Sequence, residues 1–347
     1  MPTAGESVGN AGNGQAPTAP TNGATRLEDL LFCGFQTKTL ATAVTELDVT
    51  PPPPWTGFGS LSDARTVAIA FAMERRGDGS GDLCCPGPAA PGPTLAFGGT
   101  PLEFLRHVTG RGTGPNNGRG GGLSWSDRRR GLVAAAGPPG TMTQVMAGAA
   151  MAVQHRREPR AALVFESGRA ADSGGWHEGL NLAASQHAPL ILVMAPPSTL
   201  GGQDLPHRGT PADAYGVECL TVHDEPLGEL LDRVGEARSH ALGRGGPVLI
   251  RLLPLDPEEQ WAGLDGLVDE CRDKGLIPEP VLDELPIRAE RDVNHALRRL
   301  EREPLPDPAE ALAPVLDGAL RVPPWTRQDP PVPGNRTPLN PPGGILG

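Results

Sequence analysis

Apolar and polar positions along the middle of this chain follow two different periods, and each period predicts one kind of element. Short apolar runs predict buried strands, and they span residues 161–165, 190–194, 219–222 and 247–253. Between them, apolar residues recur at three- and four-residue steps, which predicts helices over residues 142–157, 176–186 and 226–242. The same spacing predicts helices over 27–43 and 60–76, followed by a Gly/Pro-rich break over 77–99.

This alternation of strands and helices predicts the fold class. Strands that are apolar throughout and separated by helices are typical of a parallel sheet with both faces covered. We therefore expect an α/β protein with a doubly wound parallel sheet and helices on both faces. In such a fold, ligands bind at the carboxyl ends of the strands.

Composition sets the expected domain limits. The chain has 47 Gly and 40 Pro among 347 residues, which is far above average usage. Residues 1–25 carry almost nothing apolar and residues 321–347 are dominated by proline, so we expect both to be disordered tails. Residues 26–320 then form one domain, which a charged helical segment extends from about residue 264 to residue 303.

Charge and the lack of targeting signals limit partners and location. The net charge of −11 argues against nucleic acid as a general partner, because an acidic surface repels a phosphate backbone. We expect a cytoplasmic protein, since the sequence has neither an apolar run of about twenty residues nor a secretory signal. Five scattered cysteines argue against a disulfide framework, and the adjacent Cys84 and Cys85 belong either to a metal site or to a loop or the core.

One strand-to-helix corner carries the residues of greatest chemical interest. Residues 164–170 read VFESGRA, between the strand predicted at 161–165 and the helix predicted at 176–186. Corners of this kind hold phosphates, metals or nucleophiles. Ser167 resembles the nucleophile of a hydrolase elbow, but that turn needs a glycine two residues to each side, where this chain has Phe165 and Arg169.

The helix after this corner carries a family resemblance. Residues 174–193 read GGWHEGLNLAASQHAPLILV, with His177 to Asn181, Ala183, Ala184 and Pro189 in a familiar frame. This stretch resembles the alpha subunit of the thiamine-diphosphate-dependent 2-oxo acid dehydrogenases, the decarboxylating component of the pyruvate, branched-chain and acetoin complexes. Segments 99–114 and 118–152 and the stretch near Glu303 are also similar to that family. The resemblance implies a thiamine-diphosphate-binding fold and a beta-type partner subunit or self-association.

The cofactor site of that family is incomplete in this sequence. In the family, a Gly-Asp-Gly corner and an Asn-Asn pair at neighbouring strand ends hold the magnesium ion of thiamine diphosphate, which needs hard oxygen ligands. The corner falls on Glu166-Ser167-Gly168 and the pair on Pro196-Pro197. The resemblance leaves Ser167 and Gly168 as the remaining cofactor-binding positions, with no catalytic or metal-binding residue assigned. Thiamine diphosphate and magnesium are thus implied for the family but are not expected to bind this chain alone.

Two further family features are missing, according to the same resemblance. A Tyr-Arg pair on the phosphate side of the cofactor corresponds to residues 85–93, which contain neither residue type. A histidine-bearing loop should follow the strand at 247–251, but the chain continues as LLPLDPEEQW without a histidine.

Three other groups have competing interpretations. Gly77-Asp78-Gly79 has the same sequence as the family's metal-binding corner. No βαβ unit lies between it and Asn116-Asn117, so a turn is the favoured interpretation. His177 and Glu178 form either an acid/base pair or a structural contact, and the structural use is favoured because neighbours on a helix point apart. Arg119 and Arg128 to Arg130, near the glycines at 118–122, form either an anion contact or a solvated or interface loop.

The sequence leaves two functional hypotheses open. The first is a non-catalytic relative of the alpha subunits that has lost its own cofactor site and acts as a scaffold or regulatory subunit. The alternative is an active subunit that carries out oxidative decarboxylation of a 2-oxo acid with acyl transfer to lipoyl, together with a beta-type partner. The missing metal ligands favour the first hypothesis.

Overall fold

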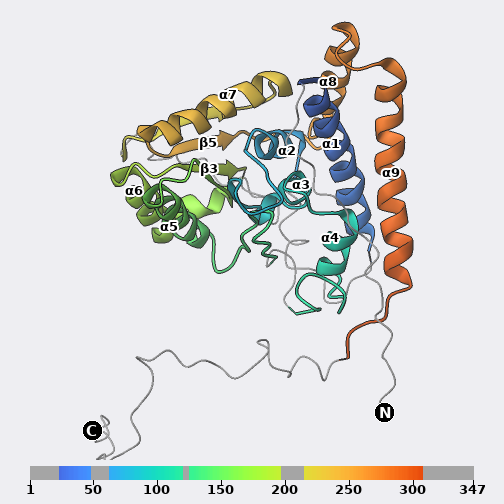
Figure 1. Cartoon of the computed structure of the whole chain (residues 1–347), viewed down its shortest axis with the longest axis horizontal. Helices are drawn as coiled ribbons and strands as arrows, with labels where there is room; N and C mark the ends of the chain where they lie inside the picture. Colours follow the sequence, from blue (N-terminus) through green and yellow to red (C-terminus); the bar gives the residue numbers. More distant parts are fainter. Residues whose placement is uncertain (1–22, 48–61, 120–124, 197–214, 308–347) are drawn as a thin grey trace, which may run out of the picture. The chain divides into compact units, whose positions relative to one another are not determined.

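A five-stranded parallel sheet forms the centre of the computed structural model, which describes residues 23–47, 62–119, 125–196 and 215–307 (Figure 1). The strands are β1 (Leu83–Cys85), β2 (Ala162–Ser167), β3 (Leu190–Ala195), β4 (Glu218–Val222) and β5 (Val248–Leu252). Their order is β1-β2-β3-β5-β4. β2 and β3 pair from Ala162 opposite Leu190 to Ser167 opposite Ala195, so the two strands end side by side.

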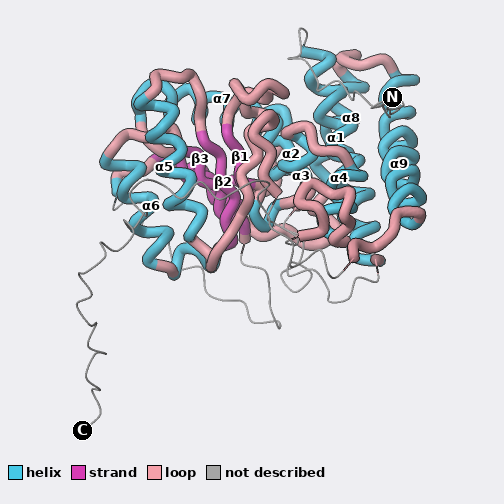
Figure 2. Tube along the Cα trace, turned by 60° about the horizontal axis from the view of Figure 1, so that its bottom comes forward, coloured by secondary structure: helices cyan, strands magenta, loops and turns pink. Residues whose placement is uncertain are grey.

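Helices cover both faces of the sheet (Figures 1 and 2). One face packs against α5 (Thr141–His155) and α6 (Gly174–Ser185), and the other packs against α2 (Ala64–Phe71) and α7 (Leu227–His240). Alternate residues of a strand point to opposite faces. In β2, Leu163 and Phe165 therefore join the α2/α7 core, whereas Ala162 and Val164 join the α5/α6 core. The predicted doubly wound sheet with helices on both faces is confirmed.

A further layer of helices extends the α2/α7 core. It consists of α1 (Gly23–Glu46), α3 (Gly92–Ala96), α4 (Pro101–Val108), α8 (Ala262–Asp273) and α9 (Glu279–Glu301). The long helices α1 and α9 lie side by side (Figures 1 and 2). Just after α9, the Glu303 carboxylate accepts from Arg106 Nε at 3.0 Å, which joins α9 to α4 and holds the pKa of Glu303 below its usual value.

The structure corrects three details of the predicted elements. β1 lies inside the stretch predicted as a Gly/Pro-rich break, because three residues are too few to show a period. The helix predicted over 60–76 is the shorter α2, which ends at Phe71; beyond its end, the backbone N of Glu74 donates to the Asp82 carboxylate at 2.7 Å. The helical segment predicted over 264–303 is divided into α8 and α9 by Gly275, which has φ +60°. The predicted tails lie almost wholly outside the described residues, and the domain limits stay a prediction.

The structure also bears on the expected state of the cysteines and on membrane-spanning helices. All five cysteines are free, and Cys84 and Cys85 are buried in β1 as part of the core. Within the described ranges no three His, Cys, Asp or Glu residues come together as a metal site. None of the helices in those ranges is long and apolar enough to cross a membrane.

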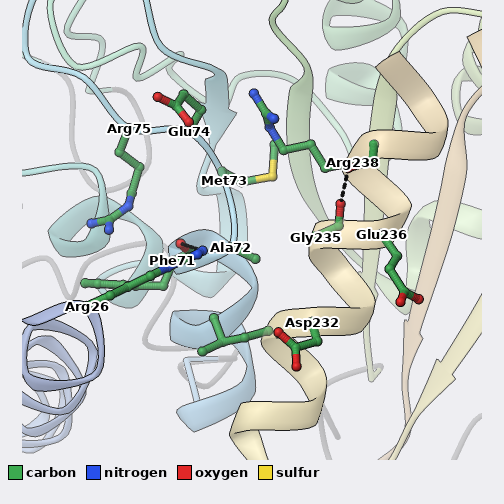
Figure 3. A pocket seen from close by; sticks show the side chains of 12 residues that line it. Arg26, Phe71, Ala72, Met73, Glu74, Arg75, Asp232, Gly235, Glu236 and Arg238 are labelled. Atoms are coloured by element: carbon green, nitrogen blue, oxygen red, sulfur yellow. Dashed lines mark hydrogen bonds between the residues drawn. The ribbon is translucent and has the colours of Figure 1, made fainter. Parts of the chain in front are cut away.

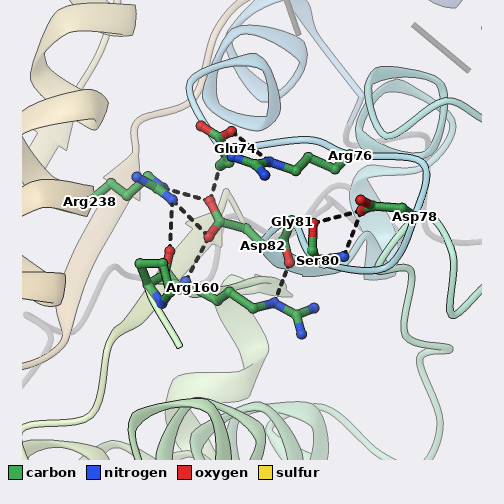
Figure 4. A network of polar contacts seen from close by, with 10 residues as sticks. Glu74, Arg76, Asp78, Ser80, Gly81, Asp82, Arg160 and Arg238 are labelled. Atoms are coloured by element: carbon green, nitrogen blue, oxygen red, sulfur yellow. Dashed lines mark hydrogen bonds and ion pairs between the residues drawn. The ribbon is translucent and has the colours of Figure 1, made fainter. Parts of the chain in front are cut away.

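A buried carboxylate ties three elements together at the amino end of the sheet (Figure 4). Asp82 precedes β1 and is 1% exposed. Its oxygens accept from Arg238 Nε of α7 at 2.6 Å, from Ala161 N before β2 at 2.7 Å and from Glu74 N at 2.7 Å. Arg160, next to Ala161, donates to the backbone oxygen of Gly81. The starts of β1 and β2 and the end of α7 are thus held at one point.

An open pocket of about 810 Å³ lies at this same end of the sheet (Figure 3). Arginines from α1 and the end of α2 line one wall, and carboxylates of α7, including Asp232 and Glu236, line the other. The arginines already hold backbone oxygens: Arg26 donates to Phe71 O at 3.1 Å and Arg75 to Ala96 O at 2.9 Å. Cations favour helix carboxyl ends, which explains both contacts without a ligand.

Two glycines of the α5/α6 pair are expected to respond to alanine in opposite directions. A Cβ on Gly179 of α6 would lie 2.7 Å from the backbone N of Gln144 in α5, so Gly179→Ala should push the helices apart and destabilise by about 1–3 kcal/mol. Gly148 faces open space on α5, so Gly148→Ala should stabilise by about 0.5–1 kcal/mol through helix propensity. Urea unfolding measures both changes. Equal effects of the two substitutions would contradict the close helix crossing.

Candidate functional site

The corner after β2 lies where two helices begin. β2 ends at Ser167, a short 3-10 turn spans Gly168–Asp172, and Ser173 caps α6 by accepting from Trp176 N at 3.2 Å. Gly140 is the N-cap residue of α5, and a Cβ at Gly140 would lie only 2.0 Å from Ser173 Oγ. The amino ends of α5 and α6 therefore touch at the carboxyl end of β2.

Glu166 points to α5 and caps it. Its carboxylate accepts from Gly140 N at 3.2 Å, from Thr143 N at 3.1 Å and from Thr143 Oγ1 at 3.3 Å. The side chain faces α5 because Ala162 and Val164 do so and residues two apart share a face. This carboxylate supplies the acceptor that Gly140 cannot, since a glycine N-cap has no side-chain oxygen.

Burial dominates the electrostatics of Glu166. The residue is 6% exposed, and this burial raises the pKa of its carboxyl, while the hydrogen bonds from Gly140 and Thr143 act in the opposite direction. The neighbouring Cys85 thiol has a pKa raised to about 12 by its own burial, with the charge of Glu166 adding to the effect. The thiol is therefore no nucleophile, which agrees with its place in the core.

The end of β3 offers no ligand beside this corner. Ala195 lies opposite Ser167, and Pro196 follows it directly. A proline has neither a side-chain oxygen nor a backbone N–H. The second position of the expected pair, Pro197, lies outside the described residues. The two cofactor positions retained by the sequence, Ser167 and Gly168, are both half-buried at the tip of β2.

The segment after β1 lies against the tip of β2 and carries only short side chains. Gly87 has φ +47°, and a Cβ there would lie 2.4 Å from Phe165 O, so the backbone approaches β2 too closely for any larger residue. Residues 86–93 are all Pro, Gly or Ala. The segment that corresponds to the family's Tyr-Arg pair is thus beside the corner, without a polar or charged side chain over residues 86–93 that could hold a phosphate.

The other end of the carboxyl edge is closed by a buried ion pair that the sequence did not single out. Asp63 caps α2 by accepting from Thr66 N at 2.9 Å, and Arg65 Nη2 lies 2.6 Å from Asp63 Oδ2. Arg65 also donates to Leu253 O, just after β5, at 2.8 Å. The capping pattern was visible in the sequence, but the contact with β5 joins residues 188 positions apart.

The described residues of the corner do not fit a magnesium-held diphosphate. Magnesium needs oxygen ligands in near-octahedral geometry, usually including a carboxylate. Of the carboxylates near the tip of β2, Glu166 faces α5 and Asp172 is exposed at the end of the 3-10 turn. Arg169 adds an exposed cation at the same turn. No step of a thiamine-diphosphate reaction can therefore be derived from these residues.

Two of the other candidates have structural surroundings. His177 Nδ1 lies 3.0 Å from the Tyr215 hydroxyl and its ring meets Trp176 edge-on, whereas Glu178 is exposed and turned away. This favours the structural use of His177. Asp78 accepts from Ser80 N at 2.9 Å in an exposed turn, which agrees with the interpretation of Gly77-Asp78-Gly79 as a turn.

The group of arginines near the glycines at 118–122 is partly neutralised by carboxylates. Arg130 Nη1 lies 3.0 Å from Glu103 and 3.1 Å from Asp127, whereas Arg128 and Arg129 are exposed. Of the glycine-rich stretch nearby, residues 120–124 lie outside the described part of the chain. Arg130 is therefore a structural residue, and the two exposed arginines stay open to either interpretation.

Known proteins share sequence similarity with most of this chain. The model of the dehydrogenase E1 component family matches residues 57–253, more than half of the chain and all five strands. The chain belongs to the dehydrogenase E1 component family. The family resemblance identified in the sequence is thereby confirmed, since relatives in this family include alpha subunits of acetoin, pyruvate and 2-oxoisovalerate enzymes.

Two relatives show the extent of this similarity. The chain is 24% identical over 253 residues to the alpha subunit of acetoin:2,6-dichlorophenolindophenol oxidoreductase from Cupriavidus necator, covering 65% of this chain and 75% of that protein. It is 25% identical over 281 residues to the alpha subunit of 2-oxoisovalerate dehydrogenase from Bacillus subtilis, covering 72% and 83%. Among solved structures, transketolase from Leishmania mexicana is similar with a TM-score of 0.46 and 15% identity, over 79% of this chain and 46% of that one.

Proposed function

We propose that this E1 family member is an alpha-subunit-like protein whose own cofactor site is degenerate. It acts as a non-catalytic scaffold or regulatory subunit and associates with a beta-type subunit or with itself. The orientation of Glu166 carries the proposal, because the carboxylate at the corner is committed to α5 and is not available to a metal ion. Pro196 at the end of β3 supports it, since it has no oxygen-bearing side chain.

The second candidate function is an active subunit. Such a subunit would carry out thiamine-diphosphate-dependent oxidative decarboxylation of a 2-oxo acid with acyl transfer to lipoyl, together with a beta-type partner. The names of the relatives favour it, since they are alpha subunits of dehydrogenases or of an oxidoreductase. The partner would then have to supply ligands that the described corner lacks.

Calorimetry with thiamine diphosphate and magnesium separates the two functions. We expect no saturable binding by the purified chain, whether alone or mixed with a beta-type subunit, because a carboxylate ligand and the Asn-Asn pair are missing. Saturable micromolar binding in either preparation would refute the degenerate site and support the active subunit.

A restored variant provides the matched positive test. Ser167→Asp combined with Pro197→Asn returns the two family ligand types to the strand ends, and we expect weak but measurable magnesium binding. Even the loss of a residue that only supports a ligand lowers metal affinity roughly 10- to 100-fold, so returning ligands should give a gain of at least that order. Ser126→Asp, which adds a carboxylate at an exposed position away from the corner, is the control and should bind none.

A further inference from the structure

The amino end of α5 is built to receive a negative charge. The first backbone N–H groups of a helix have no partner within it, and together with the helix dipole they attract anions. In α5, a helix of 15 residues, the N-cap residue is Gly140, which provides no side-chain acceptor. The N–H groups of Gly140 and Thr143 point to the carboxyl end of β2.

Glu166 fills this position from within the chain. Its two oxygens share three donors, and the side chain is buried against α5 with 6% exposure. β2 is held between β1 and β3, so the carboxylate is fixed before any ligand arrives. The hydrogen bonds from Gly140 and Thr143 favour its ionised form and act against its burial, which raises the pKa of the carboxyl.

The surroundings of this carboxylate would hold a second anion if Glu166 were neutral or absent. Gly140 of α5 is in contact with Ser173, the N-cap of α6, so two helix amino ends converge on the corner. Arg169 adds a cation two residues beyond the tip of β2. With Glu166 in place, an incoming phosphate meets a like charge in a poorly solvated position, where repulsion is strong.

We propose that Glu166 is a built-in anion that closes the amino end of α5 and excludes external phosphate groups from the corner. The inference rests on the proposed loss of the cofactor site and gives it a cause beyond the missing metal ligands. The Glu166 carboxylate excludes a phosphate group because it occupies the N–H groups of α5 and because its negative charge repels the phosphate. Removing Glu166 reopens the corner to a diphosphate even when no magnesium is present.

Inorganic pyrophosphate without magnesium is the probe that tests this inference. The full-length chain is compared with Glu166→Ala, which removes the cap, and with Glu166→Gln, which keeps its size but not its charge. We expect no effect of pyrophosphate on the parent chain and a saturable rise in Tm of roughly 2–4 °C for Glu166→Ala at several times the Kd. Glu166→Gln should bind more weakly than Glu166→Ala, but at least about tenfold more tightly than the parent chain.

Glu178→Ala is the matched control, since Glu178 is an exposed carboxylate on α6 that does not cap α5. It should behave as the parent chain does. Pyrophosphate binding by the parent chain as tight as by the variants would overturn the inference, and so would the lack of a gain in both variants. If Glu166→Ala does not fold even with pyrophosphate, Glu166→Gln decides. The result is independent of the thiamine diphosphate titration, which decides the proposed function on the parent chain with magnesium.

Discussion

Asp82→Ala is expected to lower the free energy of unfolding by about 3–5 kcal/mol, because it breaks a buried ion pair by removing only one partner. The Asp82 side chain has no exposed area, while Arg238 keeps 18% of its side chain exposed. The substitution leaves the Arg238 guanidinium without its carboxylate. It also leaves the buried backbone N–H groups of Glu74 and Ala161 without their acceptor, and each such group adds to the cost.

Urea unfolding at neutral pH measures this effect, with Asp78→Ala as the control. Asp78 lies four positions away in the same loop, but it is exposed and holds only Ser80, so its loss should change stability by less than about 1 kcal/mol. Asp82→Asn should fall between the two, since an amide oxygen can still accept while the charge is lost. A loss at Asp82 no larger than at Asp78 would show that the three elements are not held together there.

Trp176→Ala is expected to destabilise the fold by about 3–5 kcal/mol, through lost burial and the cavity that remains. Trp176 is fully buried in the α5/α6 core, beside Leu180 and Met146. Its backbone N is held by Ser173, and its Cβ is close to Gly140, so the indole also positions the contact between the two helix amino ends. The cavity would therefore open next to the corner.

Trp176→Phe is the matched variant for this prediction. Among the residues that the structure describes, the buried indole Nε1 has no hydrogen-bond partner, so phenylalanine removes an unsatisfied donor while keeping an aromatic ring in place. We expect a loss well below that of Trp176→Ala in the same urea experiment. Equal losses for the two variants would mean that this core needs the full volume of the indole and that a smaller aromatic ring cannot fill it.

The strands and the helices that cover the sheet could be predicted where apolar residues recur with a regular period over several residues. β2 and β3 are apolar runs, and α5 and α6 carry apolar residues at helical steps. The local sequence of each element is therefore enough to predict that it is buried. β1 could not be found this way, because three residues between Pro and Gly stretches show no period. Its burial comes from neighbours that are distant in sequence, such as β2 and the segment at 131–133.

The candidate site could likewise be predicted only as far as the local sequence determines it. Ser167 and Gly168 were placed at a strand tip correctly by the pattern, since a strand that gives way to a helix must turn there. The two-residue alternation from Ala162 through Val164 favours the α5 face for Glu166. The donors that it meets could not be foreseen, because Gly140 and Thr143 lie more than twenty positions earlier and only the packing of α5 brings them to β2.

The cap on α5 links the strand tip to the stability of the α5/α6 layer. Glycine at position 166 would leave the first turn of α5 without this acceptor, since Gly140 has no side chain to offer. A side-chain acceptor cannot be moved to position 140 instead, because a Cβ there would lie 2.0 Å from Ser173 Oγ. Position 166 is therefore constrained by helix packing as well as by any chemistry at the strand tip.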